Sequence, residues 1–323
     1  MHNSAATNRH SDGPVILKFD PSRERISRSR QDEQTLGQYI PLIYHYNMLQ
    51  DEERVGAFRA AIASIVQPGM RVLELGSGTG ILSSFAARQG ATVDAVERNP
   101  ELVDCSRRFL SANGLQGRVR VVAADAAQWV PDHPVDVVIC EMLHVGLLRE
   151  KQAQVISTFK HNYARRFGPK LPVFIPEVSI LMCQPVQYDF DFAGFVAPVP
   201  SFHAPTQFQP RTHEIASLAT YETVDYGQAI PAALNASESF IATAGGVVNA
   251  IRLVTQNVLA VDVESQSAVT WPNQCLILPI NAPLECSEGE VVDVTMEYEA
   301  GATIESIRYN ATSRTSVPHR KAG

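Results

Sequence analysis

The chain of 323 residues has few cysteines and no long apolar run. Its five cysteines are widely spaced and form no C-x-x-C pair. That pattern argues against a disulfide framework or a metal site, and it predicts free thiols in a reducing compartment. No stretch approaches the roughly 18 apolar residues of a membrane span, and residues 1–10 lack the apolar run of a signal peptide. We therefore expect a cytoplasmic protein with neither a metal ion nor a membrane partner.

The chain also lacks an excess of basic residues. It has 27 Lys and Arg against 34 Asp and Glu, a formal net charge of −7. Because phosphate contacts need clustered cations, this balance argues against a nucleic-acid partner. Hydrophobic residues make up 45% of the chain, as in ordinary globular proteins, and the length is sufficient for two domains.

The first half of the sequence alternates strand and helix patterns. We predict a flexible N-terminal segment over residues 1–32 and a first domain over 33–173, which begins with helical periodicity from 36 to 66. Strands are predicted at 71–75, 92–96, 119–123 and 135–140, and helices at 80–89 and 100–113. This alternation is typical of an α/β fold with a parallel sheet covered on both faces.

Helical periodicity disappears after about residue 172. Short strands between turn residues are predicted at 173–185, 237–243, 247–263, 274–280, 290–299 and 303–306. They predict a second domain over 174–323, an antiparallel sheet or barrel. A proline-rich stretch around 194–218 has no periodicity and is interpreted as a short arm or inserted loop.

A glycine-rich loop indicates a nucleotide site. Gly76, Gly78 and Gly80, with Thr79 between them, follow a predicted strand and open a predicted helix. Glycine lets the backbone turn sharply and approach a ligand closely, and the helix N-terminus offers free N–H groups. A simple turn is the alternative explanation of the glycines.

Two acidic residues after the next strands support the nucleotide interpretation. Glu97 ends the second predicted strand, where a carboxylate can accept hydrogen bonds from both ribose hydroxyls. Asp125 follows the third strand, near where an adenine amino group would lie, although it could instead cap a helix over 126–129. A nicotinamide dinucleotide remains open, but Glu74, two residues before the first glycine, makes the loop resemble that of S-adenosylmethionine-dependent class I methyltransferases. Arg54 could pair with the carboxylate of that cofactor.

Glu141 and Glu150, nine positions apart, indicate what the cofactor reacts with. Two carboxylates at the mouth of a nucleotide site suit a planar cation with several donors, and guanidinium presents five N–H groups in a fixed fork. The alternative is a solvated loop, with Glu141 at a strand end and Glu150 paired with Arg149 or Lys151.

Several segments, in order and in register, resemble the protein arginine methyltransferases. Residues 45–54 are similar to the family's H-E-E-M-L-x-D-x-x-R segment, and residues 72–82 read V-L-E-L-G-S-G-T-G-I-L against its V-L-D-V-G-S-G-T-G-I-L. Tyr39 matches a tyrosine of its Y-F-x-x-Y element, Glu141 and Glu150 its double-E loop, and residues 174–177 the step into its β-barrel. The resemblance implies a Rossmann-like domain, a C-terminal barrel and S-adenosylmethionine-dependent N-methylation of a guanidino group.

The resemblance also implies roles for individual residues. Cofactor contacts are expected from Tyr39, Met48, Arg54, Gly76, Gly78, Thr79, Glu97, Asp125 and Ala126, with Arg54 on the carboxylate, Glu97 on the ribose and Met48 near the methyl group. Glu141 and Glu150 would hold the guanidinium. His45, paired with an acid, could help remove the proton.

The departures from the family cluster on the substrate side. Thr270, next to Trp271, stands where the family's T-H-W loop has a histidine that would pair with Asp51, and Met142 replaces the tryptophan after Glu141. The arm is shorter than the family's. These changes favour free arginine or a small guanidine over an arginine-rich peptide as substrate, and the family's habit suggests a homodimer. The alternatives are a methyltransferase with a different N- or O-acceptor and a non-catalytic cofactor-binding scaffold.

Overall fold

The computed structural model describes residues 40–205 and 209–314, to which all structural statements refer. Tyr39 and the N-terminal segment predicted to be flexible therefore lie outside the described residues. Among the helices that are described, none is both long enough and apolar enough to cross a membrane.

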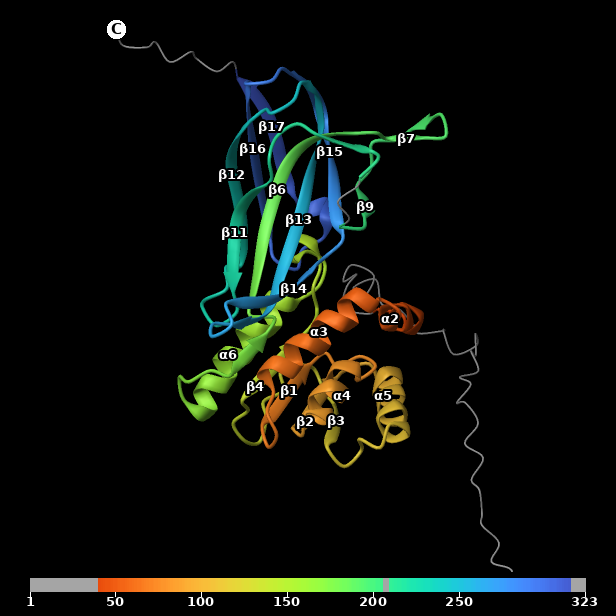
Figure 1. The fold of residues 1–323 in the computed structure, drawn as a ribbon, viewed down its shortest axis with the longest axis vertical. Coiled ribbons are helices and arrows are strands. Elements are labelled where there is room, and N and C mark those ends of the chain that lie inside the picture. Colours follow the sequence, from red (N-terminus) through yellow and green to blue (C-terminus); the bar gives the residue numbers. More distant parts are fainter. Residues whose placement is uncertain (1–39, 206–208, 315–323) are drawn as a thin grey trace, which may run out of the picture. The chain divides into compact units, whose positions relative to one another are not determined.

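A five-stranded parallel sheet forms the first domain, as the sequence predicted (Figure 1). Its strand order is β3-β2-β1-β4-β5, with β1 at the centre. The strands are β1 (Arg71–Leu75), β2 (Thr92–Glu97), β3 (Val119–Ala123), β4 (Val137–Cys140) and β5 (Val173–Ile175). Helix α4 (Ile81–Arg88) follows β1, and helix α5 (Pro100–Ala112) follows β2. The bounds of both helices lie within one residue of the predicted ones.

The helices around this sheet differ from the prediction in two places. The single helical stretch predicted over 36–66 is two helices, α2 (Leu42–Leu49) and α3 (Glu52–Ile65). They are separated because Asp51 caps α3, its Oδ1 accepting from the backbone N–H of Arg54 at 3.0 Å. Helix α6 (Gln152–Phe167), which connects β4 to β5, was not predicted, although buried residues such as Val155, Ile156 and Phe159 recur at helical spacing.

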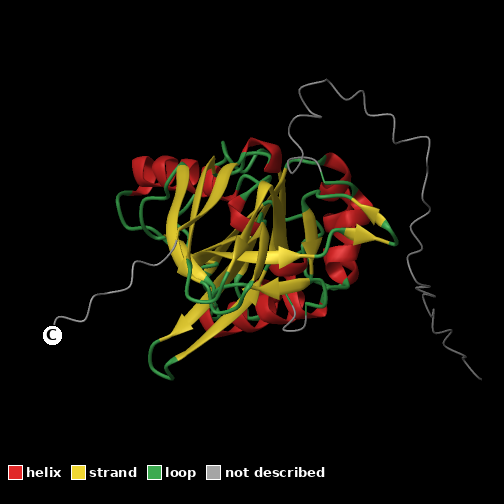
Figure 2. Cartoon of the chain, turned by 90° about the horizontal axis from the view of Figure 1, so that it is seen from above, coloured by secondary structure: helices red, strands yellow, loops and turns green. Residues whose placement is uncertain are grey.

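The second domain is antiparallel, as predicted, and consists mainly of two sheets. One has seven strands, built around β6 (Val178–Tyr188), β13 (Gly246–Asp262) and β15 (Cys275–Cys286), and the other has the order β12-β16-β17. The remaining strands of the first sheet are β9 (Ser201–His203), β10 (Thr212–Glu214), β11 (Ala219–Asp225) and β14 (Ser267–Pro272). Those of the second are β12 (Ala233–Ile241), β16 (Val291–Glu299) and β17 (Arg308–Arg314). Viewed from above, the strands of the two domains overlap at the centre of the picture (Figure 2).

Three predictions in this domain are corrected. The strand expected over 173–185 is divided at Pro176, so that β5 belongs to the parallel sheet and β6 to the antiparallel one. The segment 303–306 contains a short 3-10 helix, Ile304–Ser306, instead of a strand. The arm around 194–218 is not simply a loop: it contains β8 (Phe195–Val196), which pairs with β7 (Asp191–Phe192), and also β9 and β10.

Helix α3 joins the two domains. It packs against β13 and β14 at the base of the antiparallel sheet (Figure 1). Phe58 of α3 is fully buried, and its ring centroid lies 6.1 Å from that of Trp271 on β14. One continuous apolar core runs through both domains, so the substrate side of the site is fixed to the cofactor side.

Candidate active site

The candidate site lies where the order of the parallel strands reverses, between β1 and β4. Leu75 and Cys140, the last residues of these strands, are register neighbours. The glycine loop and Glu141 therefore start side by side, as ligand sites do at such switch points. Gly76 has φ +75°, a left-handed backbone conformation that favours glycine, and its Cα faces the end of the Met142 side chain.

Glu97 braces the glycine loop. Its two carboxylate oxygens accept from the backbone N–H groups of Gly78 at 2.9 Å and of Asn99 at 2.8 Å. Each oxygen keeps a further lone pair, so the carboxylate can still accept the ribose hydroxyls that the sequence assigned to it.

Glu74 also holds the glycine loop and the start of α4 in place, a role that its position in the sequence did not predict. It is 3% exposed, and it accepts hydrogen bonds from the backbone N–H of Ser83, at 2.8 Å, and from the Ser83 hydroxyl. Burial raises the pKa of Glu74 to about 8, against a smaller opposing effect of the bonds from Ser83.

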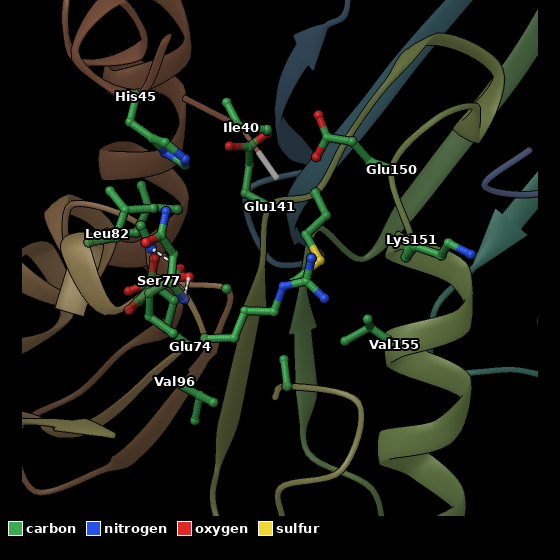
Figure 3. A pocket seen from close by; sticks show the side chains of 18 of the residues that line it. Ile40, His45, Glu74, Ser77, Leu82, Val96, Glu141, Glu150, Lys151 and Val155 are labelled. Atoms are coloured by element: carbon green, nitrogen blue, oxygen red, sulfur yellow. Dashed lines mark hydrogen bonds between the residues drawn. The ribbon is translucent and has the colours of Figure 1, made fainter. Parts of the chain in front are cut away.

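A cavity of about 260 Å³ opens above this loop (Figure 3). Its lining includes the predicted residues His45, Met48, Arg54, Gly76, Gly78, Thr79, Glu97, Asp125, Ala126, Glu141 and Glu150. Two buried polar atoms of the lining, Arg54 Nε and Ser77 Oγ, have no hydrogen-bond partner among the described residues. A nucleoside cofactor with a carboxylate and hydroxyls would satisfy such atoms, so the residues fit S-adenosylmethionine.

Asp125 lies beside this cavity in a turn rather than at the start of a helix. Its Oδ1 accepts from the backbone N–H of Ala127 at 2.9 Å. Asp125 therefore bonds to the backbone two residues later, as in an Asx turn, instead of capping a helix. Its second carboxylate oxygen stays available to a ligand.

Arg54 differs from expectation, because it pairs with Glu141 of the double-glutamate loop. Its Nη1 forms an ion pair with Glu141, and its Nη2 donates to the carbonyl of Met48 at 2.9 Å. Both side chains are almost buried, with 10% and 11% of their surface exposed. Arg54 therefore lies between the cofactor cavity and the substrate side, with Nε left for a cofactor carboxylate.

The two glutamates lie close together and have unequal partners (Figure 3). Burial raises the pKa of Glu141, and Arg54 partly offsets that effect. Burial raises the pKa of Glu150 well above its ordinary value, and the neighbouring charge of Glu141 raises it further. In the part of the chain that the structure describes, an ion pair joins Glu141 to Arg54 and none joins Glu150 to a cation.

Within the described residues, His45 has no hydrogen bond or ion pair with an acidic side chain, whereas an acidic partner was predicted for it. Its ring lies against Gly78, where a Cβ would stand 3.2 Å from Nδ1. Burial, with a smaller contribution from Arg54, lowers the pKa of His45 to about 4, so the imidazole is neutral and weakly basic at pH 7. This geometry indicates that His45 packs over the glycine loop, and it does not support His45 as the group that accepts a proton.

A second cavity of about 240 Å³ lies on the other side of the glutamates and forms an acceptor groove. Asp51 and Trp271 line it, as predicted, but Thr270 is exposed on β14 and does not. The groove also contains residues that sequence analysis missed, among them His144, Phe202, Asn273 and Gln274. Phe202 meets His144 edge-on, with ring centroids 5.5 Å apart, and no local pattern in the sequence relates these two positions.

The antiparallel domain holds the loop between the glutamates. Gly146, with φ +65°, donates its N–H to Thr255 Oγ1 at 2.8 Å and accepts at its carbonyl from the Tyr298 hydroxyl at 2.9 Å. Asn273 Nδ2 donates to the carbonyl of Leu143 at 3.2 Å. The loop is thus anchored from β13, β16 and the turn after β14, and not only from the strand that precedes it.

Comparison with known proteins identifies a methyltransferase domain in this chain. Residues 72–163 match a family model described as a methyltransferase domain. The chain is 26% identical to an uncharacterised protein of Methanocaldococcus jannaschii over 83% of this chain and 96% of that protein. It is 32% identical to an arginine N(omega)-methyltransferase of Streptomyces achromogenes, over 40% of this chain but only 37% of that enzyme.

The fold has solved counterparts. The Trypanosoma brucei PRMT1 enzyme–prozyme heterotetramer with AdoHcy matches with a TM-score of 0.65 and 18% identity, over 84% of this chain and 96% of that one. At that identity the match supports the two-domain architecture alone. The methyltransferase family model, which covers residues 72–163, and the fit of the cofactor cavity together indicate an S-adenosylmethionine-dependent methyltransferase domain in this part of the chain.

Proposed function

We propose that this enzyme methylates a guanidino nitrogen of arginine. The observation that carries the proposal is the charge of the acceptor groove: Glu141 and Glu150 face it together, and Arg54 is the one cation that an ion pair joins to either of them among the described residues. A carboxylate in a poorly solvated site is costly without a partner. A bound guanidinium would supply both the missing charge and the N–H donors.

The groove residues would activate and orient the acceptor. S-adenosylmethionine, when bound, supplies the electrophilic methyl group. The pKa of a guanidinium, above about 12, makes its nitrogens poor nucleophiles, so Glu141 and Glu150 would draw positive charge toward the nitrogens that do not react. They would also fix the angle of attack, and such positioning can lower a barrier by roughly 7–11 kcal/mol.

The methylated nitrogen must lose one proton as its new N–C bond forms. His45, with its lowered pKa, is a weak base. Glu150 faces the groove, and burial raises its pKa, which makes it a stronger base than an ordinary carboxylate. We assign this step to Glu150.

The proposed acceptor is free arginine or a small guanidine. The support is the altered substrate side: Thr270 lies outside the groove, and Phe202 of the arm segment forms part of its wall. A homodimer and a cytoplasmic location remain predictions from the sequence.

Mass spectrometry of reactions with S-adenosylmethionine tests the proposal. One tube contains free arginine and another an arginine-rich peptide, and each is repeated with Glu141→Gln and with Glu53→Gln, an exposed control on α3. We expect free arginine to gain one methyl mass with the wild type and the control, and not with Glu141→Gln. Methylation of the peptide alone would overturn the choice of acceptor. Cofactor binding without either product would overturn the guanidine assignment.

A further inference from the structure

Gln152 is a buried polar residue for which the proposed mechanism has no use. It is the first residue of α6 and is 0% exposed. Its position, two residues after Glu150, places it behind the double-glutamate loop, and it is absent from the lining of both cavities at the site. It therefore touches neither the cofactor cavity nor the acceptor groove.

The Gln152 amide bonds to the backbone on both sides of Glu141. Its Nε2 donates to the carbonyl of Cys140 at 2.8 Å, and its Oε1 accepts from the N–H of Met142 at 2.9 Å. These two peptide groups bracket Glu141, so one side chain restrains the backbone from which that carboxylate projects.

The Gln152 side chain bonds to the backbone of β4 at the point where pairing with β5 ends. The last pair of these two strands is Ile139 with Ile175, and the residue after β5 is Pro176, which has no N–H to donate. Buried backbone groups beyond that point need another partner. An amide is suited to this position because it offers a donor and an acceptor without adding charge beside two glutamates.

We propose that Gln152 is a positioning residue for Glu141 and sets the direction of its carboxylate across the acceptor groove. This proposal rests on the proposed function only where it is tested by kcat, since the effect on the backbone at 140–142 does not depend on the acceptor. Loss of either hydrogen bond frees the backbone at 140–142 and leaves a buried group unpaired. Misplacement of a positioned group by about 1 Å can cost on the order of 100-fold in rate.

The first test compares Gln152→Leu with Gln184→Leu. Gln184 is a matched control, 1% exposed, whose amide donates to a carbonyl within the antiparallel domain. We expect Gln152→Leu to lose about 100-fold in kcat, with cofactor Kd within about two-fold of wild type. Equal losses of kcat in both variants at equal losses of Tm would reduce Gln152 to a structural role and overturn the proposal.

A second variant, Gln152→Glu, gives a signature that lost stability does not. A protonated carboxyl can replace both hydrogen bonds of the amide, whereas a carboxylate cannot donate. We expect this variant to regain kcat toward wild type as pH falls, relative to the wild-type profile at each pH. A ratio of the two rates that does not change with pH would contradict the proposal.

Hydrogen exchange separates this proposal from the proposed function. In Gln152→Leu, amide exchange of the peptide containing residues 140–144 should quicken at least about ten-fold, with the peptide containing 76–83 unchanged. Unchanged exchange at 140–144 would overturn the positioning role whatever the acceptor. Faster exchange in a protein that methylates no guanidine would retain the positioning role and reject the proposed function.

Discussion

The two halves of the site are built in different ways. The lining of the cofactor half lies within the first domain, around the carboxyl ends of β1 and β2, and Glu74 and Glu97 hold its glycine loop. The acceptor half draws on α2, the double-glutamate loop, β9, β14 and the turn that follows, and it therefore takes residues from both domains. A half lined by one domain should tolerate changes in the antiparallel domain, and the acceptor half should not.

The largest effect is expected for Glu150→Gln. Loss of this carboxylate should lower kcat at least about 100-fold and change cofactor Kd much less, because Glu150 lines both cavities but its proposed role is toward the acceptor. In the wild type, kcat/KM should fall as pH is lowered through the raised pKa of Glu150, because a protonated carboxyl no longer attracts guanidinium. Rate measurements across pH with isothermal titration of the cofactor test both statements. If Glu150→Gln mainly weakened cofactor binding, the division of the site into a cofactor half and an acceptor half would be wrong.

Gly78→Ala should damage the cofactor half selectively. Gly78 has φ +52°, and a Cβ there would lie 3.2 Å from His45 Nδ1. The left-handed backbone costs about 1–2 kcal/mol for an L-residue, so cofactor Kd should rise by roughly 5- to 30-fold. Gly117→Ala is a control position with open space around it. An acceptor KM that rises as much as the cofactor Kd would show that the halves are not separable.

Tyr298→Phe tests whether the antiparallel domain sets the acceptor half. The change removes the hydroxyl that donates to Gly146 and that lies 2.6 Å from the Tyr221 hydroxyl. We expect a loss of about 1–3 kcal/mol in the free energy of unfolding and a several-fold fall in kcat/KM for the acceptor. Cofactor Kd should not change. Tyr309→Phe, which removes a hydroxyl bonded to Pro279 instead, should leave kcat/KM at the wild-type value.

The smallest effect on activity is expected for Glu74, which contributes to stability within the cofactor half. The folded pKa of Glu74, about 8, exceeds its ordinary 4.5, so between these values the folded protein keeps a proton that the unfolded chain releases. The free energy of unfolding should therefore decrease as pH rises through this window, by up to about 1.4 kcal/mol per pH unit. Glu74→Gln should flatten that slope in urea unfolding at several pH values. Glu101→Gln, at an exposed position on α5, should not.

The parts of the site that sequence analysis placed well are those with local signals. The glycine loop needed positive φ at three positions, and the strand bounds of β1 and β3 followed from short β-branched runs between turns. Thr270 and His45 were placed less well, because a match in sequence position does not say where a side chain lies. Thr270 faces outward on β14, and His45 packs against Gly78 without an acidic partner in the described ranges.

Local patterns were sufficient to predict the parallel sheet, the cofactor loop and the two glutamates after β4, because each depends on residues within a few positions of one another. The contacts of those glutamates and of their loop became visible in the folded structure alone. Three contacts join segments that are 87 to 152 residues apart in the sequence: Arg54 with Glu141, and Gly146 with Thr255 and with Tyr298. The contact of Phe202 with His144 likewise joins separate segments. Such contacts depend on how the two domains pack, and no local spacing encodes that packing.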